Sequence, residues 1–458
     1  MKLTHTVNRP IRTALAVLAV AAVPAGAVAV PAGAVAVPAG AVAVPAVAGG
    51  DRHPGTISMV SVARTGGGGN AYSGFSGRSR TSAHGRYVLF SSAASDLVAG
   101  DSNDQVDIFV RDTVTRRTTR VSVGTGGVQS NGESRPGSIS ADGRYVAFDS
   151  FASNLFRGDT NNSPDVFVHD LRTGRTTVVS VGLGGPANLG GLDSDISADG
   201  RHVAFWSSST NLVPGDTNNA QDVFVRDLDT RRTERVSVTS DGRQLDLPSG
   251  EPSISGNGRV VAFVNIGGDG LVHVRDRDRS TTRSISDGVP ADPRSFIVEH
   301  GSADVSANGR FVVFNVTGSL GVGVDPIPNV WLRDLRTNKL ELISADYQGN
   351  MSTVIGSAVG AVSADGRYVA YSTQARTSRA DHGTLGDVYR LDRKTGARVW
   401  ITYQQDPTDP WGSRPGSSSP GISGDGQHVA FESDDSRLAG PPGPGGHEIY
   451  LWSATKPR

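Results

Sequence analysis

One phrase recurs along the chain, and its pattern of polar and apolar positions decides which elements the sequence predicts. Each copy has a short polar turn built on a glycine, followed by a continuous run of apolar residues. The seven copies are TSAHGRYVLFSS (81–92), SISADGRYVAFDS (138–150), DISADGRHVAFWS (195–207), SISGNGRVVAFVN (253–265), DVSANGRFVVFNV (304–316), AVSADGRYVAYST (361–373) and GISGDGQHVAFES (421–433). Their central glycines are separated by 58, 57, 58, 51, 57 and 60 residues. A repeat period in this range predicts a solenoid or a propeller.

The second copy shows which strands one repeat predicts. Residues 137–140 form a short strand, here called a, and Ala141-Asp142-Gly143 form a tight turn in which glycine supplies the positive φ. Strand b follows at 144–148 as an apolar run, typical of a strand covered on both faces. After a longer loop, DVFVHD (165–170) predicts strand c, and TTVVSV (176–181) predicts strand d. Four antiparallel strands joined by hairpins make one propeller blade, and stacked blades supply the core.

The two ends of the repeat array predict how the ring closes. Thr56–Val62 has the pattern of a strand d without its a, b and c, and Glu448–Trp452 has the pattern of a strand c without its d. If these segments share one blade, each strand type occurs seven times and two open edges become paired. We therefore predict an all-β, seven-bladed β-propeller over residues 56–454, with four antiparallel strands per blade and the N-terminal strand joining the C-terminal blade. The alternative is an open ring with frayed ends.

The phrase S-x-D-G-R-x-V-A-F, followed by D-V-F-V-R-D, resembles the WD40-like repeat (PD40) of TolB-type β-propellers. The resemblance covers residues 56–454, and it is specific because the phrase recurs seven times in register. It implies a propeller in a secreted bacterial protein. TolB has an additional N-terminal α/β domain and six blades, whereas this sequence predicts seven blades and no such domain. The role of TolB with an outer-membrane lipoprotein therefore does not carry over; only the repeat does.

The first 50 residues have the pattern of an export signal. Three cationic residues among the first twelve precede an apolar segment at Thr13–Val23, which is too short to span a bilayer. VPAGAVA then occurs three times in Val23–Ala43, and Ala46-Val47-Ala48 offers one of several cleavage sites. We expect residues 1–50 to be a signal peptide with an Ala/Val/Pro-rich low-complexity segment, and the mature protein to be extracellular or associated with the cell wall. The alternative, a retained membrane anchor, is disfavoured because prolines interrupt any long helix.

Composition excludes several classes of function. The net charge is −1, so nothing in the charge balance indicates electrostatic binding of nucleic acid. There is no cysteine, which excludes disulfides, thiolate metal sites and a cysteine nucleophile. The chain also lacks a G-x-S-x-G motif, the nucleophile elbow of propeller-bearing peptidases. The 58 glycines and 24 prolines suit a turn-rich β protein.

Loop length predicts which face of the ring binds a ligand. In a blade, the a–b and c–d turns lie on one face, and the b–c and d–a connections lie on the other. The first pair is short and uniform, whereas the second pair is long and varied. Examples are the d–a connections 124–136, 182–192 and 239–251 and the b–c connections 150–164 and 207–221. Variable loops on a rigid scaffold are typical of a binding face.

The b–c loops of the first three blades carry a candidate metal motif, D-x-N-x-x-x-D. Oxygen ligands at alternate positions of a polar loop suit a hard cation such as Ca²⁺. The alternative is a set of Asx-turns, in which the side chains bond to nearby backbone amides. Both interpretations stay open at this point. The candidate residues are Asp101, Asn103 and Asp107; Asp159, Asn161 and Asp165; and Asp216, Asn218 and Asp222.

A further acid follows each motif where an EF-hand has its twelfth ligand, namely at Asp112, Asp170 and Asp227. Five extended residues separate Asp107 from Asp112, roughly 16 Å at strand rise, which is too far for one ion. Asp276, Asp334 and Asp392 occupy the same place in blades without the motif. We expect all of these acids to cap the c–d turns instead.

Two other sets of residues could carry chemistry. Trp411 lies in a polar d–a loop, where an aromatic ring could stack on a sugar or a partner side chain. Glu133, Glu251 and Glu299 lie in or near d–a loops and could meet at the mouth of the central channel. The sequence therefore favours a monomeric, non-enzymatic scaffold that binds a protein or a cell-wall glycan. The alternative is a glycoside hydrolase or polysaccharide lyase that uses channel-mouth carboxylates.

Overall fold

The structure is a computed structural model, and the part of the chain that it describes is built from strands and turns. The described residues are 41–43, 55–74, 81–266, 272–289, 303–318, 327–351, 357–374, 377, 386–403, 416–435, 437–440 and 443–455. All of them belong to the unit Ala34–Arg458. No helix in this part is long and apolar enough to cross a membrane.

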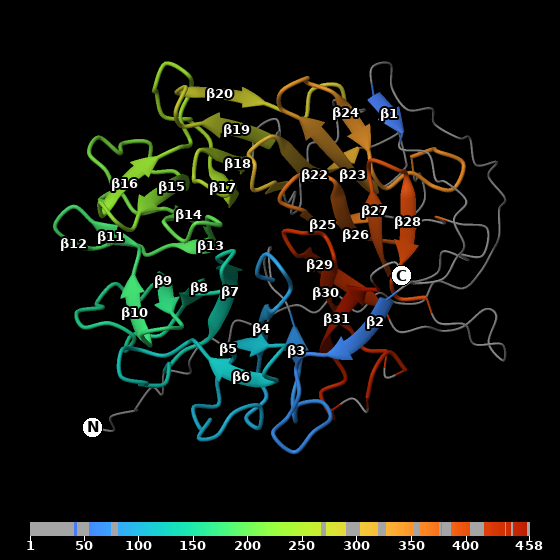
Figure 1. Ribbon diagram of the computed structural model, residues 1–458. Helices are drawn as coiled ribbons and strands as arrows, with labels where there is room; N and C mark the ends of the chain where they lie inside the picture. The colour runs from blue at the N-terminus through green and yellow to red at the C-terminus, as the bar shows by residue number, and fades with distance from the viewer. Residues whose placement is uncertain are drawn as a thin grey trace, which may run out of the picture. The chain divides into compact units, whose positions relative to one another are not determined.

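Seven antiparallel four-stranded sheets follow one another around an axis, as the sequence predicts (Figure 1). In chain order, blades 1 to 3 are β3 (Ser73–Gly74), β4 (Tyr87–Ser92), β5 (Asp107–Asp112) and β6 (Arg117–Arg120); β7 (Ser134–Ile139), β8 (Tyr145–Ser150), β9 (Asp165–Asp170) and β10 (Arg175–Val178); and β13 (Leu192–Ile196), β14 (His202–Ser207), β15 (Asp222–Asp227) and β16 (Arg232–Arg235).

Blades 4 to 7 repeat this order, and in the last blade the d strand comes from the start of the chain. They are β17 (Ser249–Ile254), β18 (Val260–Asn265), β19 (Val272–Asp276) and β20 (Thr281–Ser284); β21 (Ala303–Val305), β22 (Phe311–Gly318), β23 (Ile327–Asp334) and β24 (Leu340–Leu342); β25 (Ser357–Val362), β26 (Tyr368–Thr373), β27 (Asp387–Asp392) and β28 (Ala397–Trp400); and β29 (Ser417–Ile422), β30 (His428–Ser433), β31 (Glu448–Ala454) and β2 (Gly55–Met59).

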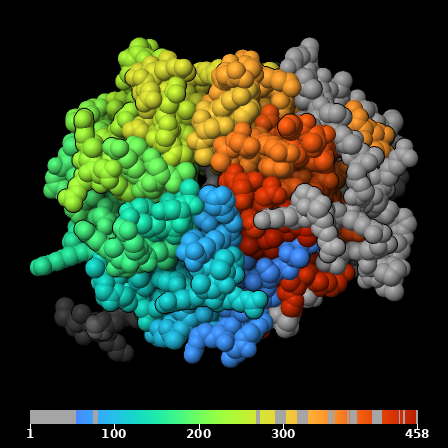
Figure 2. Space-filling model, viewed as in Figure 1, coloured from blue at the N-terminus to red at the C-terminus, as the bar shows by residue number. Residues whose placement is uncertain are grey.

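Strand β2 closes the ring. It pairs antiparallel with β31, with Thr56 opposite Ser453 and Met59 opposite Tyr450. In Figure 2 the first blue segment lies against the red end of the chain. The predicted sharing of one blade by the two ends is therefore confirmed, and both strands gain a partner for edges that would otherwise be open.

A ring of backbone hydrogen bonds closes at the a–b turns independently of β2. Each pair of neighbouring blades contributes one N–H···O bond of 2.9–3.0 Å. Successive a strands from β7 to β29 contact one another inside this ring. The bonds run from Ala83 to Ala141, Ala141 to Ala198, Asp199 to Gly256, Gly256 to Ala307, Asn308 to Ala364, Ala364 to Gly424, and Asp425 back to Ala83.

The a–b turn explains the repeated phrase S-x-D-G-R-Y. Ser140 donates to Asp142 at 2.6 Å and accepts from the backbone of Tyr145 at 2.9 Å, so the turn is held by its own side chains. Gly143 has φ of 75°. A Cβ at this position would lie 2.0 Å from the ring of Tyr87 in the preceding blade. Glycine is therefore needed both for the backbone and for blade contact.

The core lies between neighbouring sheets. Between blades 1 and 2, Leu89 and Val110 contact Val146 and Phe148, and all four are at most 2% exposed. The rings of Phe148 and Phe167 stack at 5.4 Å within blade 2. Burying such a side chain contributes about 1.5–3 kcal/mol, so each blade is stable through its two neighbours.

Three details differ from the sequence-based elements. Strand β10 ends at Val178 rather than at residue 181, because Val181–Gly182 (β11) turns away and pairs with Gly185–Pro186 (β12). Strand β7 begins at Ser134 and contains a bulge between Pro136 and Ile139. Three residues of the low-complexity segment, Ala41–Ala43 (β1), pair in parallel with β24 at the outer edge of blade 5.

Candidate functional site

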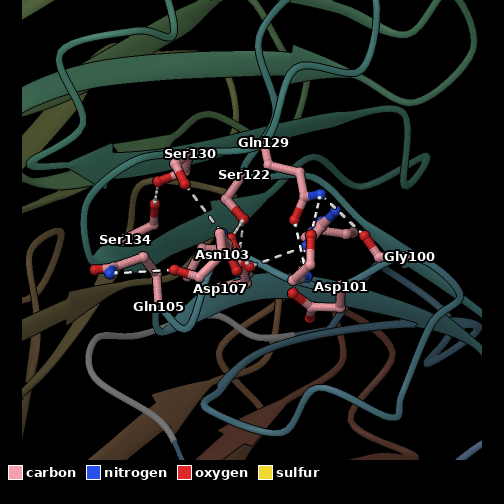
Figure 3. Close-up of polar contacts among 12 residues, drawn as sticks. Gly100, Asp101, Asn103, Gln105, Asp107, Ser122, Gln129, Ser130 and Ser134 are labelled. Atoms are coloured by element: carbon pink, nitrogen blue, oxygen red, sulfur yellow. Dashed lines mark hydrogen bonds and ion pairs between the residues drawn. The ribbon is translucent and has the colours of Figure 1, made fainter.

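The b–c loop of blade 1 is held by the residues of its D-x-N-x-x-x-D motif (Figure 3). Asp107 is fully buried at the start of β5. Its carboxylate accepts from Ser122 Oγ at 2.5 Å and from Asn103 Nδ2 at 2.9 Å. The same amide of Asn103 donates to the carbonyl of Ser130 at 3.0 Å. The motif therefore ties the b–c loop to strands c and d and to the following d–a connection.

A positively charged arginine lies beside the two carboxylates of this loop. Arg120, the last residue of β6, has Nη1 2.7 Å from Asp101 Oδ1 and 3.2 Å from Asp107 Oδ2. The side chains of Arg120 and Asp101 are only 10% and 5% exposed. Burial raises the pKa of Asp101, and the charge of Arg120 opposes this shift. The guanidinium thus balances two buried carboxylates.

Blade 3 repeats the arrangement with different residues at the same register. Arg235 Nη1 lies 3.2 Å from Asp216 Oδ1 and 3.3 Å from Asp222 Oδ2. It also donates to Gln244 Oε1 at 2.6 Å. The Asp216 side chain is 2% exposed, so this guanidinium is again buried against two carboxylates.

Blade 2 has the same loop without the arginine. The strand pairing places Val178 at the position of Arg120 and Arg235. Burial raises the pKa of Asp165 to about 6, and the nearby charge of Asp159 adds to this shift. Burial also raises the pKa of Asp159, whose Oδ1 atom is buried without a hydrogen-bond partner. No ion pair among the described residues includes either carboxylate.

Two of the three motif asparagines form Asx-turns, whereas Asn103 Oδ1 of blade 1 is buried without a hydrogen-bond partner. Asn161 Oδ1 accepts from the backbone of Ser163 at 2.8 Å, and Asn218 Oδ1 accepts from the backbone of Ala220 at 3.2 Å. Within the described ranges, no three His, Cys, Asp or Glu side chains gather closely enough to hold a metal. An ion in such a loop would therefore bind two carboxylates together with neutral oxygens. Calcium binding stays a prediction.

The acids at the ends of the c strands cap the c–d turns, which confirms the expectation for them. Asp170 accepts from the backbone of Arg172 at 2.9 Å, and Arg144 holds its other oxygen at 2.7 Å. These hydrogen bonds lower the pKa of Asp170 to about 2. The same Arg–Asp pair occurs in six blades: Arg86–Asp112, Arg144–Asp170, Arg201–Asp227, Arg259–Asp276, Arg310–Asp334 and Arg367–Asp392.

Exposed apolar side chains gather in the long connections. Among the described residues, nine large hydrophobic side chains are exposed, and eight of them belong to b–c or d–a connections. The ninth, Val114, lies in a c–d turn on the opposite face. The eight are Tyr72, Val128, Phe151, Leu183, Leu189, Leu247, Ile266 and Tyr347.

Asparagines cross-link the loops of this face in pairs. Asn131 Nδ2 donates to Ser153 Oγ at 3.0 Å, while its Oδ1 accepts from the Ser153 backbone at 2.9 Å. Asn70 pairs in the same way with Ser95, and Asn188 pairs with Thr210. Each pair joins a d–a connection to the b–c loop of the next blade. The loops of blades 1 to 3 are therefore fixed relative to one another.

The structure describes two of the three glutamates that the sequence groups at the channel mouth. Glu133 forms an exposed ion pair with Arg135 at 3.0 Å. Glu251 lies at the bulge of β17 with φ of 49°. Glu299 and Trp411 lie outside the described residues.

A different carboxyl pair lies between blades 2 and 3, and the sequence gives no sign of it. Asp149 of β8 is 2% exposed and accepts from the backbone of Asp193 at 2.6 Å. Asp193 sits at the bulge of β13 with φ of 53°, where its carboxylate accepts from the indole of Trp206 at 2.6 Å. Burial and the charge of Asp193 raise the pKa of Asp149 to about 7.

A serine or threonine just beyond strand d was also missed, although its V-S or I-S/T dipeptide recurs in every repeat. In six of the seven blades the hydroxyl pairs with the first polar residue of strand c. The pairs are Ser122–Asp107, Ser180–Asp165, Ser237–Asp222, Ser344–Asn329, Thr402–Asp387 and Ser61–Glu448.

Solved structures similar to this chain are TolB-type and other WD40-like β-propellers. TolB from Acinetobacter baumannii is 17% identical with a TM-score of 0.38, and the match covers 64% of this chain but only 58% of the TolB chain. The β-propeller domain of the Trilobed protease from Pyrococcus furiosus is 14% identical over 70% of this chain and 81% of that domain, with a TM-score of 0.43. The acylaminoacyl peptidase from Pyrococcus horikoshii is 12% identical over 84% and 52% of the two chains, with a TM-score of 0.49.

No family model and no curated protein matches the chain. The strand pairing described above establishes the fold directly.

Proposed function

We propose that this chain is an extracellular, non-enzymatic binding scaffold whose b–c and d–a loops bind a partner protein. The observation that carries the proposal is the placement of eight of nine exposed large apolar side chains in these loops. Aromatic and aliphatic side chains of this kind supply the buried centre of protein interfaces. Export is supported by the cationic and apolar pattern of the first 23 residues.

The cross-linked loops support the same function. Binding normally costs entropy, because loops and side chains must become ordered at the interface. The pairs made by Asn70, Asn131 and Asn188 already hold neighbouring loops together in the free protein. Leu189 directly follows Asn188, and Phe151 lies two residues before Ser153. The backbone N–H of Leu189 donates to Ser209 Oγ and that of Phe151 to the carbonyl of Glu133, both at 2.9 Å, so both backbones are positioned in advance.

A glycan-cleaving enzyme is the alternative, and no described carboxylate favours it. Such enzymes need two accessible carboxyl groups about 5–10 Å apart. Glu133 is engaged by Arg135. Asp149 has the raised pKa of a general acid, but it is buried between two blades and out of reach of a sugar.

The test compares two faces of the same protein. Wild-type protein is used to capture partners from the extracellular fraction, beside the triple variant Phe151→Ser, Leu183→Ser and Leu189→Ser and the control Val114→Ser on the opposite face. We expect a protein that is retained by wild type and by Val114→Ser and lost with the triple variant. Equal retention by all three, with all three folded by circular dichroism, would contradict the proposed face.

A further inference from the structure

Three equivalent loops of this propeller contain the same two carboxylates, and in two of them a cation lies between these groups. The cation is the guanidinium of Arg120 in blade 1 and of Arg235 in blade 3, each within 3.3 Å of both carboxylates. Carboxylates buried at such a site need an opposite charge, because desolvation otherwise disfavours the ionised form. In blades 1 and 3 the end of strand d therefore places a cation beside these carboxylates.

Blade 2 keeps the two carboxylates but has apolar residues in place of the arginine and of the glutamine that contacts the loop. Val178 takes the place of the arginine. In blades 1 and 3 a glutamine caps the same loop, because Gln129 and Gln244 accept from the backbone of the loop at 3.2 Å. In blade 2 the position of these glutamines is taken by Pro186, which directly precedes Ala187, whose carbonyl accepts from Asn161. Both filling side chains are thus changed together to apolar residues.

The acceptors in blade 2 are nevertheless held in place. Asp165 is fully buried, and its two oxygens accept from Ser180 at 2.5 Å and from Asn161 at 3.2 Å. Asp159 Oδ1 is buried and has no hydrogen-bond partner. The equivalent atom of blade 3, Asp216 Oδ1, also has no hydrogen-bond partner, but it lies 3.2 Å from the guanidinium of Arg235, whereas no described ion pair includes Asp159. A buried acceptor without a compensating charge is costly, so its persistence beside a second carboxylate points to a ligand.

We propose that the b–c loop of blade 2 binds one calcium ion between Asp159 and Asp165, where blades 1 and 3 place an arginine guanidinium. This inference goes beyond the scaffold function and does not depend on it. The two carboxylates are the charged ligands, and backbone carbonyls and water complete the shell. Asn161 is a positioning residue, because its amide donates to Asp165 while its oxygen accepts from the backbone of Ser163.

The chemistry of the loop favours Ca²⁺ over other cations. All available donors are oxygens, which suit hard cations and not Zn²⁺ or Cu²⁺. Ca²⁺ accepts an irregular shell of six to eight oxygens, whereas Mg²⁺ requires near-ideal octahedral geometry. With only two carboxylates we expect an affinity near that of extracellular calcium modules, about 10⁻⁴–10⁻³ M.

The decisive variant installs the residue that blades 1 and 3 already have. Metal-free protein is titrated with CaCl₂ and with MgCl₂ by isothermal titration calorimetry, for wild type and for Val178→Arg, Val178→Met and Asp159→Asn. We expect one calcium per wild-type chain and weaker binding of magnesium. Val178→Arg and Asp159→Asn should weaken calcium binding at least tenfold, whereas Val178→Met, which adds volume without charge, should retain it.

Thermal melting keeps the test independent of folding defects. We expect calcium at about ten times Kd to raise the Tm of wild type by roughly 2 °C, since a ligand of the native state stabilises it. Val178→Arg should melt no lower than wild type without calcium and should not respond to the ion. Any of three results would overturn the proposal. They are a folded wild type that does not bind calcium, a stoichiometry of three calcium ions per chain, and a calcium affinity that is unchanged in Val178→Arg.

Discussion

The hydroxyl of Ser61 donates a hydrogen bond to Glu448 Oε2 at 2.5 Å across 387 residues of sequence. Ser61 also accepts from the backbone N–H of Ile449 at 2.9 Å. The same contact joins strands d and c in five other blades, where a short turn connects them, as in Ser180 and Asp165. Blade 7 thus reproduces the internal pattern of a blade with two segments from opposite ends of the sequence.

Removing the Ser61 hydroxyl should weaken the ring closure. The substitution Ser61→Ala leaves the carboxyl of Glu448 and the N–H of Ile449 without this partner in a buried position. We expect a loss of about 1–3 kcal/mol in the free energy of unfolding, measured by guanidinium denaturation. Ser58→Ala changes an exposed serine on the same strand and should stay within about 0.5 kcal/mol of wild type. Equal stability of both variants would show that the hydrogen bonds of Ser61 do not stabilise the ring closure.

The Arg–Asp pairs should make the propeller sensitive to acid. Hydrogen bonds from Arg86 and Arg144 lower the pKa of Asp112 and Asp170 to about 2. Because the pKa in the folded state lies below the unfolded value of about 3.9, the stabilisation is complete above pH 4 and is lost as pH falls toward 2. We expect Tm to fall through this range.

The substitution Asp170→Asn isolates one of these pairs. The variant should melt below wild type at pH 7, and the difference should shrink as pH approaches 2, where the wild-type carboxyl also becomes neutral. Glu133→Gln removes an exposed ion pair and should change stability by less than about 0.5 kcal/mol at either pH. A constant difference for Asp170→Asn across the range would show that its charge is unimportant.

Asp149 should have the opposite pH dependence. Its pKa in the folded state is raised to about 7, so folding favours the protonated form. The stability associated with this group is complete below pH 4 and declines as pH rises through 7. Asp149→Asn keeps an acceptor for the backbone of Asp193 and removes the charge. We expect the variant to be about 1–3 kcal/mol more stable than wild type at pH 8.

At pH 4 this advantage should disappear, because the wild-type carboxyl is then neutral in the folded protein. Asp246→Asn, in an exposed loop, serves as the control and should match wild type at both pH values. Urea denaturation at pH 4 and pH 8 measures the difference. A variant that is less stable than wild type at pH 8 would mean that the ionised carboxylate is favoured between the blades.

Alanine substitutions at two glycines with similar positive φ distinguish the cost of backbone strain from the cost of a clash with the neighbouring blade. Gly143 has φ of 75° and Gly126 has φ of 91°, so alanine is strained at either position. A Cβ on Gly143 would lie 2.0 Å from the Tyr87 ring, whereas nothing lies within 4 Å of a Cβ on Gly126. We expect Gly126→Ala to cost about 1 kcal/mol and Gly143→Ala at least about 2 kcal/mol more, measured by chemical denaturation. Similar losses in the free energy of unfolding for the two variants would show that the Tyr87 side chain can move away at little cost.

The architecture could be predicted from the sequence, since each repeat has a recognisable pattern for its strands and its a–b turn. The spacing of the central glycines predicted seven blades, and the patterns of Thr56–Val62 and Glu448–Trp452 predicted the shared one. The end of strand d was predicted three residues too late in blade 2, because the apolar run continues past Val178 into a separate hairpin.

The electrostatics of the b–c loops could not be predicted in the same way. Arg120 ends the outer-strand segment R-T-T-R, a pattern that equally suits a solvated side chain. Only the pairing register shows that Arg120 reaches a loop 13 residues earlier in the sequence and that Val178 replaces it in blade 2. The contact of Asp149 with Asp193 depends on a bulge in the next blade, which leaves no local signal.

The ring of backbone hydrogen bonds at the a–b turns has no first and no last member. Gly55 lies opposite Ala454 in the pairing of β2 with β31, at the place where the other blades have a c–d hairpin. A short linker between these two residues would make the seventh hairpin covalent, and the backbone could then be opened at any other c–d turn. Circular permutation at a c–d turn would therefore leave every blade with both of its neighbours.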